Sequence, residues 1–199
     1  MIFSSNIKII FGFTSLIVGL FVFIPYYIGI VKGKIKPHVL SWTTWGLILG
    51  VGFILSYFKG GGGGAWIFGL QSILCFGIAI WALCLKNKII TRLDWVSFTG
   101  AIVVTIFYIF TKNAVLTAIF AATIDSLGFV PTFRKSYLLP YDEPIITYAL
   151  SGLSFFISIF ALETYEFSVL FYPLVLVLMN GIFVLFLIMR RQAIKSNMI

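Results

Sequence analysis

The sequence predicts an all-α polytopic membrane protein with about seven transmembrane helices. Of its 199 residues, 61% are hydrophobic and 10% are charged, which leaves too few polar side chains to cover a soluble globule. The apolar residues fall in runs of roughly 18 to 25, and roughly 20 are needed for a helix to cross the hydrocarbon core of a bilayer. They do not alternate with polar residues, as the strands of a membrane barrel would.

A basic loop and a glycine run delimit the first three apolar segments. Ile9–Val31 ends at the lysines of VKGKIKP. It is too long for a signal peptide and lacks a small-residue cleavage site, so we expect it to be retained. His38–Tyr57 begins after Pro37, and Ala65–Leu85 follows KGGGGG. We interpret the glycine run as a flexible connector, because it lacks the Lys-Ser/Thr end of a phosphate-binding loop.

Charged residues and prolines delimit the other four segments. In order they are Trp95–Thr111, Ala114–Pro131, Pro144–Leu162 and Phe167–Met189. Asp94 precedes the fourth segment as a candidate N-cap. Only Lys112 and Asn113 separate the fourth segment from the fifth. Each segment is long enough to cross a bilayer or nearly so.

Lysines and arginines predict the orientation, because cationic loops stay on the cytoplasmic side of the membrane. Of the 14 such residues, 11 follow the first, third, fifth and seventh segments and 3 lie on the other side. We therefore expect the N-terminus outside and the C-terminus in the cytoplasm. The net charge of +8 then reflects topology and contact with anionic lipids rather than a nucleic-acid partner.

Two stretches of the chain share a pattern of paired prolines. They read GLFVFIPYYIGIVKGKIKPHVLSWTTWGL and DSLGFVPTFRKSYLLPYDEPIITYALSGL. Pro25 corresponds to Pro131, and Pro37 corresponds to Pro144 after a one-residue gap. Each pair lies between the first and second segments of a triplet, which predicts two parallel repeats joined by a linker helix, a 3+1+3 plan. The predicted divisions are 1–91, 92–112 and 113–199.

This plan, with a proline near the cytoplasmic end of the first helix of each triplet, resembles the PQ-loop superfamily, which includes SWEET-type sugar transporters and lysosomal amino-acid exporters. The glutamine of the family's Pro-Gln pair is absent from both repeats, which read Pro25-Tyr26 and Pro131-Thr132. The resemblance implies alternating access between two three-helix bundles, with Pro25 and Pro131 as hinges. Prolines that only end or kink helices are the alternative.

One face of the second segment carries Ser41, Trp42 and Trp45, which fall within an arc of about 100° on a helix. Gly46 and Gly50 form a G-x-x-x-G on another face, where a neighbouring helix can approach closely. Trp42 lies near the start of the helix and fits an interfacial anchor, whereas Trp45 lies deeper than an aromatic belt. We expect Trp45 to line a binding site, where its ring could stack on a sugar or a heteroaromatic solute.

Asp125 is the only acid well inside a predicted span. Low dielectric favours the protonated form of an unpaired carboxylate, which suits proton coupling or a hydrogen bond to a substrate hydroxyl. The alternative is a structural carboxylate that accepts hydrogen bonds from Ser126, Thr123 or the backbone near Pro131.

Polar residues on other segments complete the candidate substrate site. They are Gln71 and Ser72 on the third segment, Tyr148 and Ser151 on the sixth, and Asn180 on the seventh. SWEET-type proteins carry an asparagine on the third and seventh helices, so the resemblance implies one of these roles for Asn180, with Gln71 at the other helix. Hydrogen bonding between helices is the alternative.

The sequence favours a transporter over an enzyme. With 1 histidine and 6 acids, it offers no nucleophile beside a base, no metal cluster and no cofactor motif. We predict a carrier of a small polar or aromatic solute, such as a sugar, a vitamin or an amino acid, in a bacterial inner (plasma) membrane. A non-transporting membrane scaffold or accessory subunit is the alternative. The sequence is compatible with a homo-oligomer.

Overall fold

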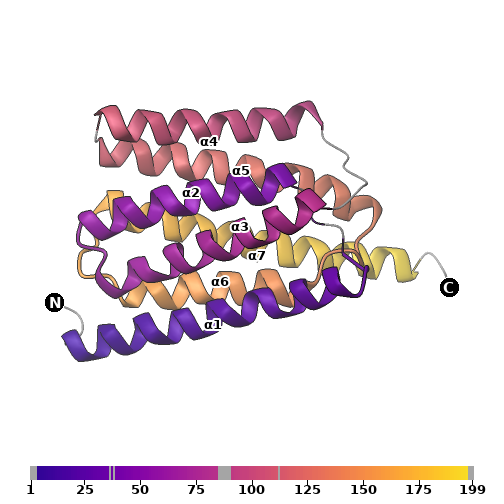
Figure 1. Cartoon of the computed structure of the whole chain (residues 1–199). Coiled ribbons are helices and arrows are strands. Elements are labelled where there is room, and N and C mark those ends of the chain that lie inside the picture. Colours follow the sequence, from indigo (N-terminus) through magenta and orange to yellow (C-terminus); the bar gives the residue numbers. More distant parts are fainter. Residues whose placement is uncertain (1–3, 36, 38, 85–90, 112, 197–199) are drawn as a thin grey trace.

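The computed structural model describes residues 4–35, 37, 39–84, 91–111 and 113–196. Within these residues it contains seven α-helices, one short 3-10 helix and no strand, as Figure 1 shows. The helices are α1 (Ser5–Val31), α2 (Val39–Phe58), η1 (Gly62–Ala65), α3 (Trp66–Cys84), α4 (Arg92–Thr111), α5 (Ala114–Leu138), α6 (Ile145–Phe160) and α7 (Phe167–Ser196). The predicted all-α class is confirmed for this part of the chain, and the number of α-helices equals the number of predicted transmembrane segments.

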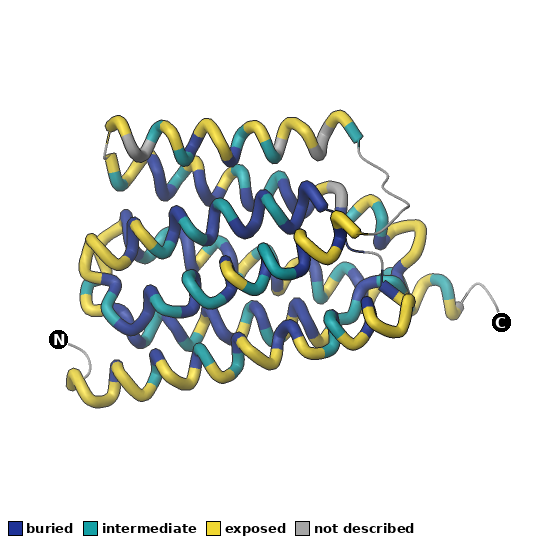
Figure 2. Tube along the Cα trace, viewed as in Figure 1, coloured by how far each residue is buried: buried dark blue, intermediate teal, exposed yellow. Residues whose placement is uncertain are grey.

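Five of these helices are long and apolar enough to cross a membrane: α1, α2, α3 together with η1, α5 and α7. The apolar part of α4 is shorter, and α6 has 16 residues, which rise only about 24 Å. Large apolar side chains such as Ile10, Phe13, Ile17 and Leu20 are exposed along one side of α1. Figure 2 shows this exposure along the outer sides of α1 and α4. The coarse prediction of an α-helical membrane protein is therefore supported.

Each helix has a defined set of neighbours. The helix α3 packs against both α1 and α2, and α7 packs against both α5 and α6. Between these groups, α1 packs against α6 and α2 packs against α5. The helix α4 packs against α2 and α5 and forms one edge of the bundle (Figure 1). We call α1–α3 the N-terminal trio and α5–α7 the C-terminal trio.

Two helix boundaries differ from the predicted ones in ways that matter. The predicted end of the fifth segment at Pro131 is wrong, since α5 continues to Leu138. A proline removes only one backbone hydrogen bond, so a helix can continue past it. Pro25 likewise lies inside α1. At the other boundary, α4 begins at Arg92, so Asp94 lies within its first turn and is not its N-cap.

Glycines of α2 face α3, as their spacing predicts. A Cβ at Gly46 would lie 3.1 Å from the ring of Phe76, and a Cβ at Gly50 would lie 3.2 Å from the hydroxyl of Ser72. The Ser72 hydroxyl donates a hydrogen bond to the Gly46 carbonyl at 2.7 Å. Ser72 therefore contributes to the close packing of α2 against α3.

The glycine run after α2 is not a loose connector. It forms η1, in which Gly63 and Gly64 are buried. The Gly64 N–H donates to the Ala161 carbonyl at 3.3 Å, and a Cβ at Gly64 would lie 2.6 Å from the Ser158 carbonyl oxygen. Glycine is required here because the end of α6 approaches the backbone too closely for any side chain.

Candidate functional site

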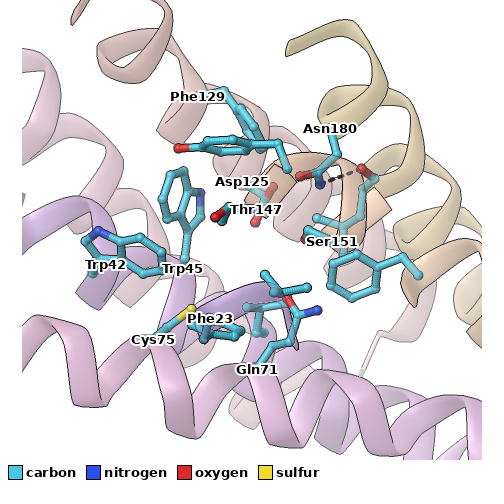
Figure 3. A pocket seen from close by; sticks show the side chains of 15 residues that line it. Phe23, Trp42, Trp45, Gln71, Cys75, Asp125, Phe129, Thr147, Ser151 and Asn180 are labelled. Carbon is cyan, nitrogen blue, oxygen red and sulfur yellow. Dashed lines mark hydrogen bonds between the residues drawn. The ribbon is translucent and has the colours of Figure 1, made fainter. Parts of the chain in front are cut away.

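A cavity lies between the two trios and draws its walls from α1, α2, α3, α5, α6 and α7. The side chains that line it are Val22, Phe23, Trp42, Trp45, Leu49, Gln71, Cys75, Asp125, Phe129, Thr147, Tyr148, Ser151, Phe155, Leu176 and Asn180. Figure 3 shows Asp125 and Thr147 between Trp45 and Asn180. The cavity is thus shared between the trios, and each trio supplies both aromatic and polar groups.

Six of the seven residues predicted to bind substrate line this one cavity. They are Trp42, Trp45, Gln71, Asp125, Tyr148 and Asn180. The seventh, Ser41, is buried but is not part of the lining. Ser151 also lines the cavity, whereas Ser72 does not. Residues far apart in the sequence are brought together because each one is the polar or aromatic position on the inner face of its helix.

Trp42 and Trp45 form an aromatic wall with their neighbours. Their ring centroids lie 5.2 Å apart in an edge-on arrangement, and Trp45 lies 5.5 Å from Phe129 of α5. The Trp42 indole N–H donates to the Tyr26 hydroxyl at 3.2 Å. Trp42 is only 6% exposed. An interfacial anchor would present its ring to the headgroups, so the anchor interpretation of Trp42 is wrong.

Asp125 is buried, with 2% of its surface exposed. Its Oδ1 accepts a hydrogen bond from the Tyr172 hydroxyl of α7 at 3.3 Å. The hydroxyls of Ser126 and Thr123 donate instead to carbonyls one turn earlier in α5, at 2.7 and 2.8 Å. The structural role proposed for Asp125 through these two neighbours is therefore not the one observed.

Three buried polar atoms in the cavity wall have no hydrogen-bond partner among the described residues. They are Oδ2 of Asp125, Nε1 of Trp45 and Oγ1 of Thr147. Such atoms are uncommon in folded proteins because burial without a partner costs free energy. A carboxylate oxygen accepts, an indole N–H donates and a hydroxyl does both. The wall therefore offers complementary contacts to a polar solute.

The two amide side chains also contribute to packing. Gln71 Nε2 donates to the Ser154 hydroxyl at 3.0 Å, which joins α3 to α6. Asn180 Nδ2 donates to the Leu176 carbonyl within α7 at 2.8 Å. One N–H of each amide is thus used between or within helices, as the alternative interpretation of these residues expects.

Sequence reasoning missed several lining residues. Phe23 and Phe129 could have been found, because they are separated along the chain by the same number of residues as Trp42 and Tyr148. An equal separation is expected of equivalent positions in two repeats. Thr147 carries no comparable signal. Nor does Tyr172, the partner of Asp125, which is one of 9 tyrosines in an aromatic chain.

The two hinge candidates lie inside helices. Pro25 and Pro131 lie within α1 and α5, and Pro25 is not among the residues that line the cavity. In the part of the chain that the structure describes, no group of three or more histidine, cysteine or acidic side chains is placed to hold a metal ion. Comparisons with protein-family models, curated proteins and solved structures find no match to this chain.

Proposed function

We propose that this protein is a membrane transporter of a small polar or aromatic solute, working by alternating access between the N-terminal and C-terminal trios. The observation that carries the proposal is the cavity between the trios, with three unpartnered polar atoms in its wall. Polar groups inside a membrane bundle are costly and mark solute pathways. Transporters place their substrate site at such an interface between repeats.

The arrangement of neighbours supports the 3+1+3 plan. Exchanging α1 with α5, α2 with α6 and α3 with α7 leaves the pattern of packed pairs unchanged. The helix α4 has no counterpart in this exchange, as expected of a linker. Two parallel repeats related by an axis along the membrane normal account for this pattern.

Residues at matched positions of the two repeats support the same plan. Phe23 and Phe129, Trp42 and Tyr148, and Trp45 and Ser151 are three pairs with equal sequence separation, and all six residues line the cavity. A binding site on a repeat axis has this property, because equivalent residues approach it from opposite sides.

The prolines fit a hinge role. Pro25 and Pro131 lie in the first helix of each trio, and these two helices carry the main contacts between trios, α1 with α6 and α5 with α2. Bending at either proline would therefore alter the contacts between the trios. The distribution of lysines and arginines supports an orientation with the N-terminus outside.

A non-transporting scaffold is the second candidate. The hydrogen bonds of Gln71 and Asn180 to protein groups favour it. A scaffold role does not explain the unpartnered Oδ2 of Asp125, since an apolar residue there would stabilise a scaffold better.

The test begins with a thermal-shift screen of purified protein against metabolites, because a ligand of the folded state raises its apparent stability. Flux of each hit is then measured in proteoliposomes with and without a pH gradient. We expect Asp125→Asn and Trp45→Ala to abolish uptake while the protein still folds. Trp81→Ala on the exposed side of α3 and Asp142→Asn in the α5–α6 loop are matched controls with wild-type flux. Wild-type rates in both site variants would exclude the site.

A further inference from the structure

We propose that the solute taken up by this cavity is an organic monocation, such as a protonated amine or a positively charged heteroaromatic ring. The inference rests on the proposed function and narrows its solute class. Two features of the cavity carry it: one carboxylate without a balancing charge, and walls that consist largely of aromatic rings.

Asp125 is the only charged residue among the described side chains that line the cavity. Two lysines elsewhere pair with acids outside it, Lys8 with Glu163 and Lys135 with Glu143. Without a partner a buried carboxylate favours its neutral, protonated form, and pairing with a cation stabilises the charged form. A cationic solute supplies this pairing. An anion would be repelled, and a zwitterion would bring a second carboxylate that no lining side chain can neutralise.

Aromatic rings form much of the remaining wall. Six of the lining residues are aromatic: Phe23, Trp42, Trp45, Phe129, Tyr148 and Phe155. Aromatic faces attract cations through the negative potential above the ring, with tryptophan the strongest, and the attraction grows when water is excluded. The same rings would stack on a neutral solute, so they favour a cation only in combination with Asp125.

The unpartnered atoms define where the polar groups of the solute lie. Oδ2 of Asp125 accepts a hydrogen bond, so an N–H or O–H of the solute cation satisfies it. Nε1 of Trp45 donates, so the solute also carries a carbonyl or hydroxyl oxygen. The Tyr172 hydroxyl bonds Oδ1, and the Tyr172 ring stacks on Phe68 with centroids 5.5 Å apart. Tyr172 thus holds the carboxylate with its second oxygen available to the solute.

Binding of two matched series to purified, full-length protein tests the proposal. The first series keeps a phenol ring and changes only the charge: tyramine, tyrosol, 4-hydroxyphenylacetate and tyrosine. The second compares choline with its neutral isostere 3,3-dimethylbutan-1-ol. We expect wild-type protein to bind the cation of at least one series at least about tenfold more tightly than the neutral member. Asp125→Asn should abolish this preference, and Asp142→Asn should retain it.

Two outcomes overturn the inference: neither series shows a preference for the cation, or the preference survives in Asp125→Asn. The wild-type comparison decides the question even where Asp125→Asn does not fold. Failure of the proposed function looks different. A cation that binds through Asp125 but does not cross proteoliposome membranes argues against the transport function and leaves the inferred charge of the solute intact. Transport of neutral solutes only argues against the inferred charge and leaves the transport function intact.

Discussion

The two ends of the helix bundle are held together in different ways. At the end that contains the start of α1, which we call the Lys8 end, polar contacts join the two trios. Lys8 Nζ lies 3.2 Å from Glu163 Oε2 and donates to the Glu163 carbonyl at 3.4 Å. The Thr164 N–H donates to the Gly60 carbonyl at 3.2 Å, beside the contact between η1 and the end of α6.

At the opposite end, which we call the Lys135 end, a network of polar contacts lies within the C-terminal trio. Lys135 Nζ lies 2.8 Å from Glu143 Oε1, and the Tyr148 hydroxyl donates to Glu143 Oε2 at 2.9 Å. Arg191 of α7 donates to the carbonyls of Glu143 and Pro140. These bonds make the C-terminal trio rigid by itself without attaching it to the N-terminal trio.

The difference indicates where a rocking motion would occur. Bonds between rigid bodies resist their separation, whereas bonds within one body move with it. If the proposed transport mechanism holds, the Lys8 end is the closed side in this conformation, and opening it requires the Lys8–Glu163 pair to break. The two trios can separate at the Lys135 end without breaking any of the bonds described above for that end.

The largest effect is expected from locking the Lys8 end. A Cβ at Gly60 would lie 4.0 Å from the Cβ of Thr164, a separation that suits a disulfide. The variant Gly60→Cys/Thr164→Cys is made with Cys84→Ser, which removes the exposed native thiol. We expect oxidation to reduce flux in proteoliposomes at least about tenfold, because the trios can no longer separate at this end. Reduction with dithiothreitol should restore it.

The two single-cysteine variants are the controls for this lock. Gly60 has a positive φ of 81°, so cysteine there adds backbone strain of about 1–2 kcal/mol, which the Gly60→Cys variant measures separately. Equal flux in the oxidised and reduced double variant would show that the Lys8 end does not open during transport.

The same comparison shows what the sequence could predict. Helices in the membrane follow from run length, and Asp125 stands out because it is an acid in an apolar run. The packed state of the glycine run could not be predicted, since glycine permits both a flexible loop and close backbone contact. Only the position of α6 decides between them. The pairing of Asp125 with Tyr172 likewise depends on how α5 and α7 pack, which hydropathy does not specify.

A second prediction concerns the stability of the contact around η1. Gly64→Ala places a methyl group 2.6 Å from the Ser158 carbonyl oxygen, so backbone must move, and we expect a loss of about 3 kcal/mol in the free energy of unfolding. Gly181→Ala in α7 is the matched control. Its Cβ meets no atom within 4 Å, so stability should stay equal or rise by up to about 1 kcal/mol. Equal unfolding midpoints would mean that η1 is not tightly packed.

The smallest effects come from the two ion pairs, and they differ between the ends. Each pair joins a buried side chain to a more exposed one: Lys8 is 3% exposed and Glu163 45%, whereas Glu143 is 5% exposed and Lys135 32%. Glu163→Gln leaves the buried Lys8 ammonium without its acid, which should cost about 1–2 kcal/mol. Lys135→Met leaves the buried Glu143 carboxylate without its lysine but with the hydrogen bond from the Tyr148 hydroxyl, so the loss should be smaller, about 0–1 kcal/mol. Thermal unfolding of each variant in the same detergent measures both.

The double variant Lys8→Met/Glu163→Gln separates stability from closure of the Lys8 end. Replacing both partners by uncharged groups removes the unpaired charge of the buried Lys8, so the unfolding midpoint should return towards that of the wild type. The ionic bond between the trios is still absent. Flux that rises above the wild-type rate while stability recovers would show that the pair resists opening. Wild-type flux together with recovered stability would limit Lys8 and Glu163 to packing of the bundle.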